Sequence, residues 1–186
     1  MKIIDNFLDK DDFLRIQDAF LSERCKWEWS AVIDDEKVNN SSYNFQFVHE
    51  IYLPFVVIQE DRDIKEIFEE VWILRKKPIP QEDELKPLLK LLKISALIKS
   101  KVNLTTKTPT LIEHGFHVDH PFPNAKTAVF YLNTCDGYTL FDNGDKVESV
   151  ENRIVIFDSN IQHTGTSVTN KSRRVVLNIN YYSDSD

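Results

Sequence analysis

Apolar residues near the N-terminus recur at the spacing of an amphipathic helix. Phe13, Ile16 and Phe20 are three and four residues apart, which puts them on one helix face. Asp9 can cap the first turn, where the helix dipole also favours the two aspartates that follow. The pattern predicts a helix that begins after Asp9 and ends near Ser22.

The rest of the N-terminal half mixes the two-residue alternation of strands with the three- and four-residue spacing of helices. Alternating aromatic residues predict half-buried strands around Trp27 and Trp29 and again from Tyr43 to Phe47. Two further stretches, 64–71 and 85–92, have helical spacing. Pro87 must sit in the first turn of the second helix or kink it.

From about residue 96 onward the apolar positions alternate, and turn signals such as Asp136-Gly137 and Asn143-Gly144 separate the runs. Many short antiparallel strands predict a β-sandwich or a jelly roll. The predicted strands cover residues 98–104, 127–133, 138–141, 146–150, 153–157 and 174–181.

Glycine and proline are segregated, with all four glycines at or after Gly115 and all seven prolines at or before Pro123. No Ser/Gly-rich or Pro-rich tether separates the two regions. We therefore expect one domain over 1–186 of mainly β (α+β) class. Residues 1–95 would supply helices and supporting strands that cover a β core formed by 96–186.

Composition and charge narrow the class of protein and the partners it can have. The chain of 186 residues is 41% hydrophobic and 28% charged, which is ordinary for a globular protein. Its 23 basic and 30 acidic residues give a net charge of −7, which argues against nucleic acid or an anionic membrane as partner. Cys25 and Cys135 are too few and too far apart for a disulfide framework. The start lacks a signal-peptide pattern, so we expect a cytoplasmic protein.

Five titratable side chains crowd residues 113–120, which have the sequence EHGFHVDH. If this stretch is extended, side chains two apart share a face, so His117 and Asp119 point the same way. A histidine and a carboxylate are two of the three ligands of a facial triad, which leaves positions open on Fe(II). Beyond Asp119 only His120, on the wrong face, and His163 could complete it, so His163 is the predicted third ligand.

These residues resemble the Fe(II)- and 2-oxoglutarate-dependent oxygenases, and within them the prolyl-4-hydroxylase-like group, over about residues 98–181. The resemblance implies a double-stranded β-helix core, of the jelly-roll or cupin-like kind, covered by helices. The resemblance matches His117 and Asp119 to the family's His-x-Asp motif and His163 to its distal histidine. One departure is Gly137-Tyr138, where the family usually has two glycines before its next strand.

The resemblance also implies a cosubstrate site. Arg174, eleven residues after His163, is similar to the oxoglutarate-binding residue of the family's closing strand, whereas Arg173 falls on the opposite face. Tyr131, in Tyr-Leu-Asn, is similar to the tyrosine that helps hold the distal carboxylate. The closing strand alternates Arg174, Val176, Asn178 and Asn180 with apolar residues, so its polar face should line the cavity.

The implied activity follows from the resemblance. His117, Asp119 and His163 would bind Fe(II), 2-oxoglutarate would chelate it, and dioxygen would take the last position, with ascorbate as a candidate reductant. Oxidative decarboxylation to succinate would then drive hydroxylation of an unactivated C–H bond. We expect a peptidyl proline or similar residue as substrate and a monomer or homodimer as the assembly.

Several alternatives stay open. The substrate could be a free amino acid or another small metabolite, bound by irregular segments such as 27–42 and 121–126. A non-catalytic metal-binding jelly-roll module needs no carboxylate-binding arginine, and Arg174 argues against it. A zinc hydrolase would need a base, for which Glu113 is the candidate, because its side of the strand is expected to face the cavity. His114 and His120 are expected to face solvent or support the ligands, and Arg153 to form a salt bridge rather than clamp a substrate.

Overall fold

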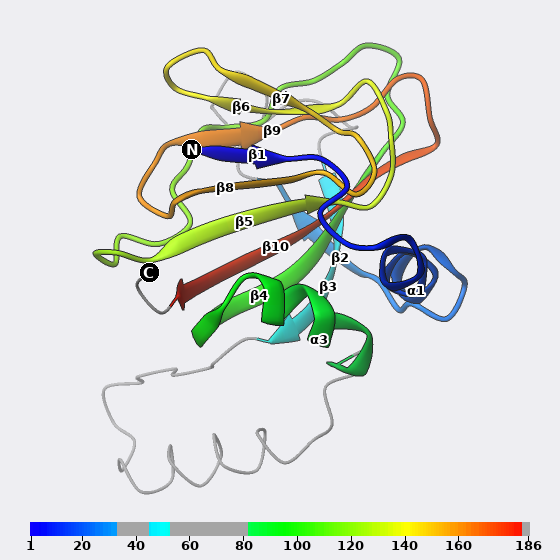
Figure 1. Ribbon diagram of the computed structural model, residues 1–186. Coiled ribbons are helices and arrows are strands. Elements are labelled where there is room, and N and C mark those ends of the chain that lie inside the picture. The colour runs from blue at the N-terminus through cyan, green and yellow to red at the C-terminus, as the bar shows by residue number, and fades with distance from the viewer. Residues whose placement is uncertain (33–44, 53–81, 184–186) are drawn as a thin grey trace, which may run out of the picture.

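The structure is a computed structural model that describes residues 1–32, 45–52 and 82–183. In this part of the chain two antiparallel sheets face each other (Figure 1). The large sheet has the strand order β1-β8-β5-β10-β4-β3-β2 and the small one the order β7-β6-β9. The strands of the large sheet are β1 (Lys2–Ile4), β2 (Glu28–Ala31), β3 (Phe45–Tyr52), β4 (Ile94–Thr106), β5 (Lys126–Tyr131), β8 (Ile154–Asp158) and β10 (Arg173–Ser183), and those of the small sheet are β6 (Tyr138–Phe141), β7 (Lys146–Glu148) and β9 (His163–Gly165).

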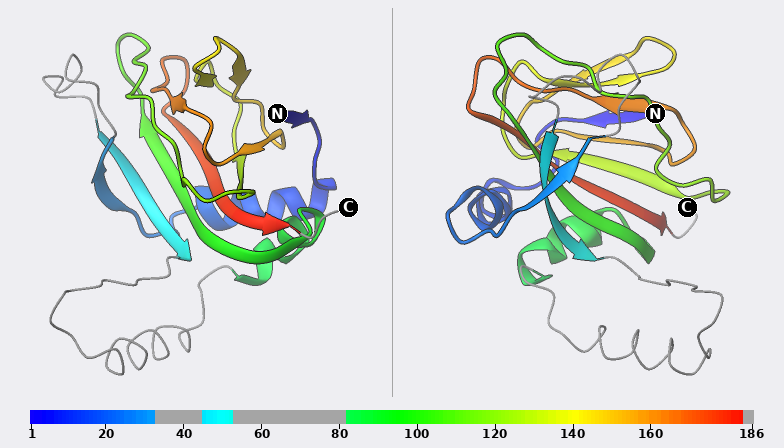
Figure 2. Two further views of the ribbon diagram at one scale, coloured as in Figure 1. Left: turned by 90° about the vertical axis from the view of Figure 1, so that its left-hand side faces the viewer. Right: turned by 180° about the vertical axis from the view of Figure 1, so that it is seen from behind.

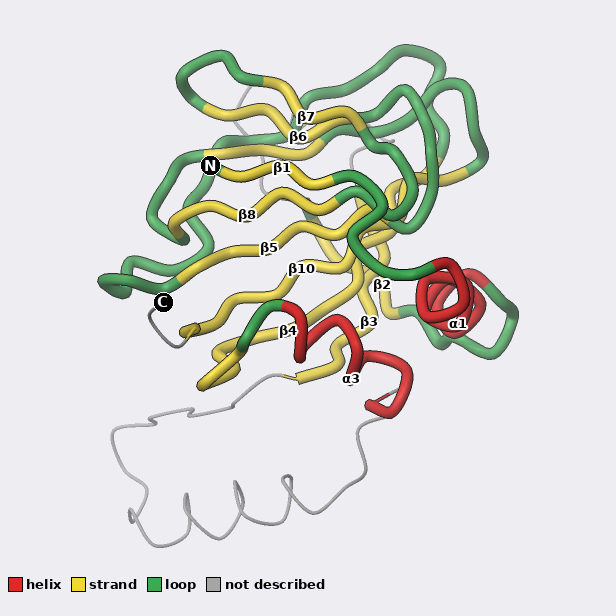
Figure 3. Tube along the Cα trace, in the orientation of Figure 1, coloured by secondary structure: helices red, strands yellow, loops and turns green. Residues whose placement is uncertain are grey.

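Two helices in the described residues, α1 (Lys10–Leu21) and α3 (Glu82–Leu91), cover the outer face of the large sheet (Figures 1 and 3). Phe13, Ile16 and Phe20 of α1 are buried against the apolar side chains of β5 and β10, such as Phe130 and Leu177. None of the described helices is long and apolar enough to cross a membrane.

The alternation of side chains along each central strand creates two separate cores. Leu177 and Ile179 of β10 point outward to the helices, while Val176 points inward. A second, smaller cluster between the sheets joins Val176 to residues such as Phe141 of the small sheet. The two layers are seen edge-on in Figure 2. This confirms the predicted mainly β fold with helices on the outside.

The first helix agrees closely with its prediction. The side chain of Asp9 accepts hydrogen bonds from the backbone N–H groups of Asp11 and Asp12, and the helix ends at Leu21 with Ser22 as its C-cap. Pro87 is the sixth residue of α3, inside the helix rather than in its first turn. The predicted helix over 64–71 and Tyr43 lie outside the described residues.

Three features were not foreseen. The start of the chain forms β1, which pairs with β8, and His163 begins the short strand β9. Trp29 lies on β2 but is 68% exposed, so the expectation of a half-buried side chain was wrong there.

Strands from both halves of the chain share one sheet and one core, which supports the proposal of one domain over 1–186.

Candidate metal and cosubstrate site

The segment that carries the first two candidate ligands is tied to β9 by its backbone. His117 donates its N–H to the carbonyl of His163 at 3.0 Å, and His163 donates back to His117 at 2.9 Å. Two residues further on, the N–H of Asp119 donates to the carbonyl of Ser159 at 3.1 Å. The segment is not a regular strand, yet these bonds fix the three predicted ligands beside one another.

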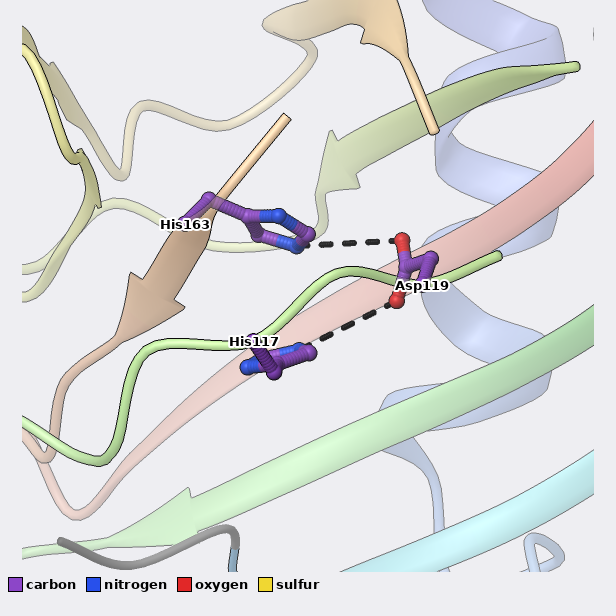
Figure 4. A group of neighbouring side chains, drawn as sticks. All are labelled: His117, Asp119 and His163. Carbon is purple, nitrogen blue, oxygen red and sulfur yellow. Dashed lines mark ion pairs between the residues drawn. The ribbon is translucent and has the colours of Figure 1, made fainter. Parts of the chain in front are cut away.

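The side chains of His117, Asp119 and His163 converge (Figure 4). Nε2 of His117 is 3.8 Å from Oδ1 of Asp119, and Nε2 of His163 is 3.7 Å from Oδ2. The three ligand atoms all lie within 4.8 Å of one another. These distances are too long for hydrogen bonds, so the groups point at a shared space rather than bond each other.

The tautomers of both histidines suit a metal. Nδ1–H of His163 donates to the carbonyl of Ile161 at 3.0 Å, and Nδ1–H of His117 faces the carbonyl of Gly115 at 3.3 Å. A carbonyl only accepts, so the proton sits on Nδ1 and the lone pair of Nε2 is directed at the shared space. Burial, followed by the neighbouring His163, lowers the pKa of His117 and keeps it neutral.

Asp119 is held as a carboxylate. Its Oδ2 accepts hydrogen bonds from Thr127 Oγ1 at 2.9 Å, Asn180 Nδ2 at 3.0 Å and Asn178 Nδ2 at 3.3 Å. Burial alone raises the pKa of Asp119, but the two histidines and the hydrogen bonds from Thr127 and Asn180 outweigh it, so the net pKa is lowered. Ligands that are already deprotonated need release no proton to a metal.

The donor set fits a divalent ion. Two imidazole nitrogens and one carboxylate are the ligands of the facial triad found in non-haem Fe(II) oxygenases. Ligands at about 2.1 Å from an ion lie about 3 to 3.4 Å apart. The separations here are 3.7 and 3.8 Å from the histidines to Asp119 and within 4.8 Å for all three atoms, so the side chains would have to rotate toward a bound ion.

A cavity of about 290 Å³ joins this triad to Arg174. Arg174 is only 5% exposed. Its Nε donates to Ser149 Oγ at 2.7 Å and its Nη2 to Thr139 Oγ1 at 3.2 Å. Among the described residues no carboxylate lies within 4 Å of the guanidinium. A buried cation without a counter-ion is costly, so a bound carboxylate would supply the partner that Arg174 lacks.

Gly137 makes room for Arg174. A Cβ at this position would stand 2.5 Å from Cδ of Arg174 and 2.8 Å from the carbonyl of Ser167. Only glycine therefore fits beside the arginine. The single glycine of Gly137-Tyr138 supplies the close approach at this turn.

Of the other predicted residues, Tyr131 lies near Arg174, whereas Arg173 and Arg153 bond to groups outside the cavity. The ring of Tyr131 lies 5.7 Å from the guanidinium of Arg174, but its hydroxyl donates to Thr139 Oγ1 at 2.8 Å and it does not line the cavity. Its contact with a cosubstrate stays a prediction. Arg173 points away and donates to the carbonyl of Leu21 at 2.7 Å, as strand parity indicates. Arg153 pairs with Asp5 at 2.5 Å, which confirms the expected salt bridge.

Of the three other titratable residues in the 113–120 stretch, Glu113 differs from expectation. Glu113 is exposed and accepts a hydrogen bond from Tyr138, so its expected place toward the cavity was wrong. His114 lines the cavity, where burial, followed by the charges of Arg174 and His117, lowers its pKa to about 4. His120 stacks on Phe122 outside the cavity, with ring centroids 5.2 Å apart.

Lining residues from β3 and β4 were missed. Gln46, Lys101, Asn103 and Thr105 face the cavity opposite the small sheet. The alternation of these three β4 residues with Val102 and Leu104 is the sequence signal that could have found them.

No family model matches the chain, and no curated protein matches it. Solved structures do. The α-ketoglutarate-dependent carbocyclase SnoK from nogalamycin biosynthesis superposes with a TM-score of 0.61 at 13% identity over 97% of this chain and 78% of that one. A Trichoplax adhaerens prolyl hydroxylase, in complex with a peptide of hypoxia inducible factor, gives 0.54 at 16% identity over 98% and 83%.

A third match carries the expected cofactors. The epimerase SnoN, in complex with Fe³⁺, α-ketoglutarate and nogalamycin RO, gives a TM-score of 0.55 at 12% identity over 97% of this chain and 78% of that one. All three are low in identity and high in coverage. Together with the paired sheets, they show that this chain has the fold of the Fe(II)- and 2-oxoglutarate-dependent oxygenases.

Proposed function

We propose that the protein is an Fe(II)- and 2-oxoglutarate-dependent oxygenase that hydroxylates an unactivated C–H bond. The observation that carries this proposal is the presence, in one cavity, of a His-Asp-His triad and a buried arginine that has no carboxylate partner within residues 1–32, 45–52 and 82–183. The triad fits the iron, and the arginine fits the far carboxylate of the cosubstrate.

Each residue then has a role. His117, Asp119 and His163 would hold the iron, with Nδ1–H bonds to backbone carbonyls keeping both rings oriented. Arg174 would bind the distal carboxylate, and its bonds to Ser149 and Thr139 fix its position. The bound iron and cosubstrate would supply dioxygen activation coupled to decarboxylation.

The rival functions have less support. A metal-binding module without catalysis gives no use for a buried cation at the far end of the cavity. A zinc hydrolase needs a base near the metal, and Glu113 is exposed and outside the lining. Peptidyl proline and a small metabolite both remain candidate substrates, because the matched structures include a prolyl hydroxylase and biosynthetic enzymes. The cytoplasmic location and the monomeric or homodimeric state also stay predictions.

The test is oxygen-dependent release of succinate from 2-oxoglutarate with Fe(II) and ascorbate. We expect slow turnover by the wild type without added substrate and none by His163→Ala. Binding supplies a second arm, because truncation of one partner of a buried ion pair costs roughly 2 to 5 kcal/mol. Arg174→Met should therefore weaken 2-oxoglutarate binding to the Mn(II) form at least about tenfold, and Arg173→Met should not. Equal behaviour of all variants in both arms would contradict the proposal.

A further inference from the structure

Lys101 is a cation on the inner face of β4 that the proposed chemistry does not use. Its neighbours Val102 and Leu104 point outward into the core beneath the helices. Lys101 points the other way and lines the cavity that holds the triad. The more a lysine is withdrawn from water, the more its charge gains from a partner.

The structure gives Lys101 no such partner. Among the described residues its ammonium has no side-chain hydrogen bond and no carboxylate within 4 Å. Glu50 lies opposite it on β3 and Asp119 lies across the cavity, both beyond ion-pair distance. Burial, followed by the charge of Lys99, lowers the pKa of Lys101. A lowered pKa means that the charged form of Lys101 is destabilised, and an anion that entered the cavity would stabilise it again.

Unpaired acceptors lie beside this lysine. Oδ1 of Asn178 and Oδ1 of Asn103 are both buried and find no hydrogen-bond partner in the part of the chain that the structure describes. Asn178 is the register partner of Lys101 on β10, and Asn103 follows two residues along the same face of β4. Their amide groups are committed to Asp119 and Gln46, which leaves the carbonyls free to accept from a ligand.

The sum of charges in the site with Fe(II) and 2-oxoglutarate bound also favours an anion beside Lys101. One Fe(II), the Asp119 carboxylate, a doubly charged 2-oxoglutarate and the Arg174 guanidinium sum to zero. The ammonium of Lys101 is then the uncompensated charge among the cavity-lining residues. The described lining also contains no phenyl, phenol or indole ring against which an apolar substrate could pack.

We propose that Lys101 binds a carboxylate of the substrate that is hydroxylated, and that Asn103 and Asn178 accept hydrogen bonds from N–H or O–H groups of the same molecule. This inference rests on the proposed function and names the substrate class: a polar acid, either a free amino acid or an acidic residue of a peptide. A single ammonium flanked by carbonyl oxygens suits a monoanion better than a phosphate.

The competing role for Lys101 is in cosubstrate binding, where it would meet the 2-oxoglutarate carboxylate at the metal. The first measurement separates the two roles. Calorimetry gives the affinity of the Mn(II) form for 2-oxoglutarate in the wild type, Lys101→Met and Lys107→Met. Lys107 lies just past β4, is exposed and is absent from the cavity lining, so its variant matches the charge change. We expect all three to bind equally.

The second measurement detects the substrate site without turnover. Mn(II) in the loaded protein broadens the proton NMR signals of small molecules that bind near it. One arm uses the common L-amino acids and their carboxamides. The other uses blocked Gly-Asp-Gly and Gly-Asn-Gly peptides, which differ in the same charge. At least one acid should bind about tenfold more tightly than its amide, since one charged hydrogen-bond partner is lost.

Lys101→Met should abolish that preference, and Lys107→Met should retain it, with melting temperatures confirming that both variants fold. The arm in which the preference appears identifies the free acid or the peptide as its source. The inference is overturned if no acid is preferred, if the preference survives in Lys101→Met, or if that variant binds 2-oxoglutarate tenfold more weakly. Failure of the wild type to bind Mn(II) and 2-oxoglutarate would instead contradict the proposed function itself.

Discussion

His114 lines the cavity and is not a member of the triad, so its protonation can be followed apart from the ligands. Its pKa in the folded protein is lowered to about 4 by burial and by the charges of Arg174 and His117. The unfolded chain has the ordinary value of about 6.5 and therefore binds the proton first as pH falls. Stability that is present above pH 6.5 is accordingly lost as pH falls toward 4.

This shift predicts a pH effect on unfolding of the metal-free protein. A pKa difference of this size corresponds to about 3 kcal/mol. Urea titrations at pH 7 and pH 4 should show a smaller loss of unfolding free energy in His114→Gln than in the wild type, by up to that amount. A remaining loss is expected in the variant, because the pKa of His117 is lowered as well. Parallel losses in both proteins would mean that His114 is hydrated in the folded state.

At the level of single residues, the sequence predicted the direction of side chains that alternate along an extended segment. His117 and Asp119 lie where a two-residue alternation placed them, and Arg174 and Arg173 fall on opposite faces as parity required. It could not place His114, because which face of an irregular segment meets the cavity depends on tertiary packing. Lys101 was missed although the alternation along β4 contains the signal for it.

Among the elements, the turn before β6 makes the sharpest prediction. Gly137→Ala would put a methyl group against Arg174 and the backbone of Ser167, at 2.5 and 2.8 Å in the unrelaxed chain. Arg174 must therefore move, and 2-oxoglutarate affinity should fall at least about tenfold while Mn(II) affinity is kept. Calorimetric titration of each ligand measures both quantities.

Gly144→Ala is the matched control for this turn. Gly144 has a φ of +89°, and a Cβ added there would meet no atom within 4 Å. Its substitution should cost roughly 1 kcal/mol of stability through backbone strain, with no effect on 2-oxoglutarate. A similar loss of cosubstrate affinity in both variants would indicate general destabilisation rather than displacement of Arg174.

Elements with strong local sequence signals were predicted well, whereas strands that depend on hydrogen bonds to distant strands were not. The first helix has its cap, its acidic first turn and its apolar stripe within one short stretch, and its ends were right. β1 and β9 have three residues each and exist because distant strands bond to them. A three-residue strand carries too little alternation to be recognised in a sequence.

For the whole molecule, the strand signals predicted a sandwich or a jelly roll and the family resemblance implied a double-stranded β-helix, which the paired sheets and the structural matches bear out. The position of β2 and β3 at the edge of the large sheet was not predictable, because hydrogen-bond partners far apart in sequence leave no periodic trace. These edge strands are what bring Ser30 and Gln46 to the cavity. This side of the cavity wall therefore depends on the part of the fold that sequence patterns describe least.

The most direct test of the account is the effect of Mn(II), a redox-inert stand-in for Fe(II), on thermal unfolding. At 100 times its dissociation constant a ligand stabilises a protein by about 2.7 kcal/mol, which for a domain of this size raises the melting temperature by about 5 to 10 °C. Asp119→Ala should lose most of this rise, and Asp11→Ala, on the exposed side of α1, should keep it. An equal rise in all three proteins, or none in the wild type, would contradict a metal site at His117, Asp119 and His163.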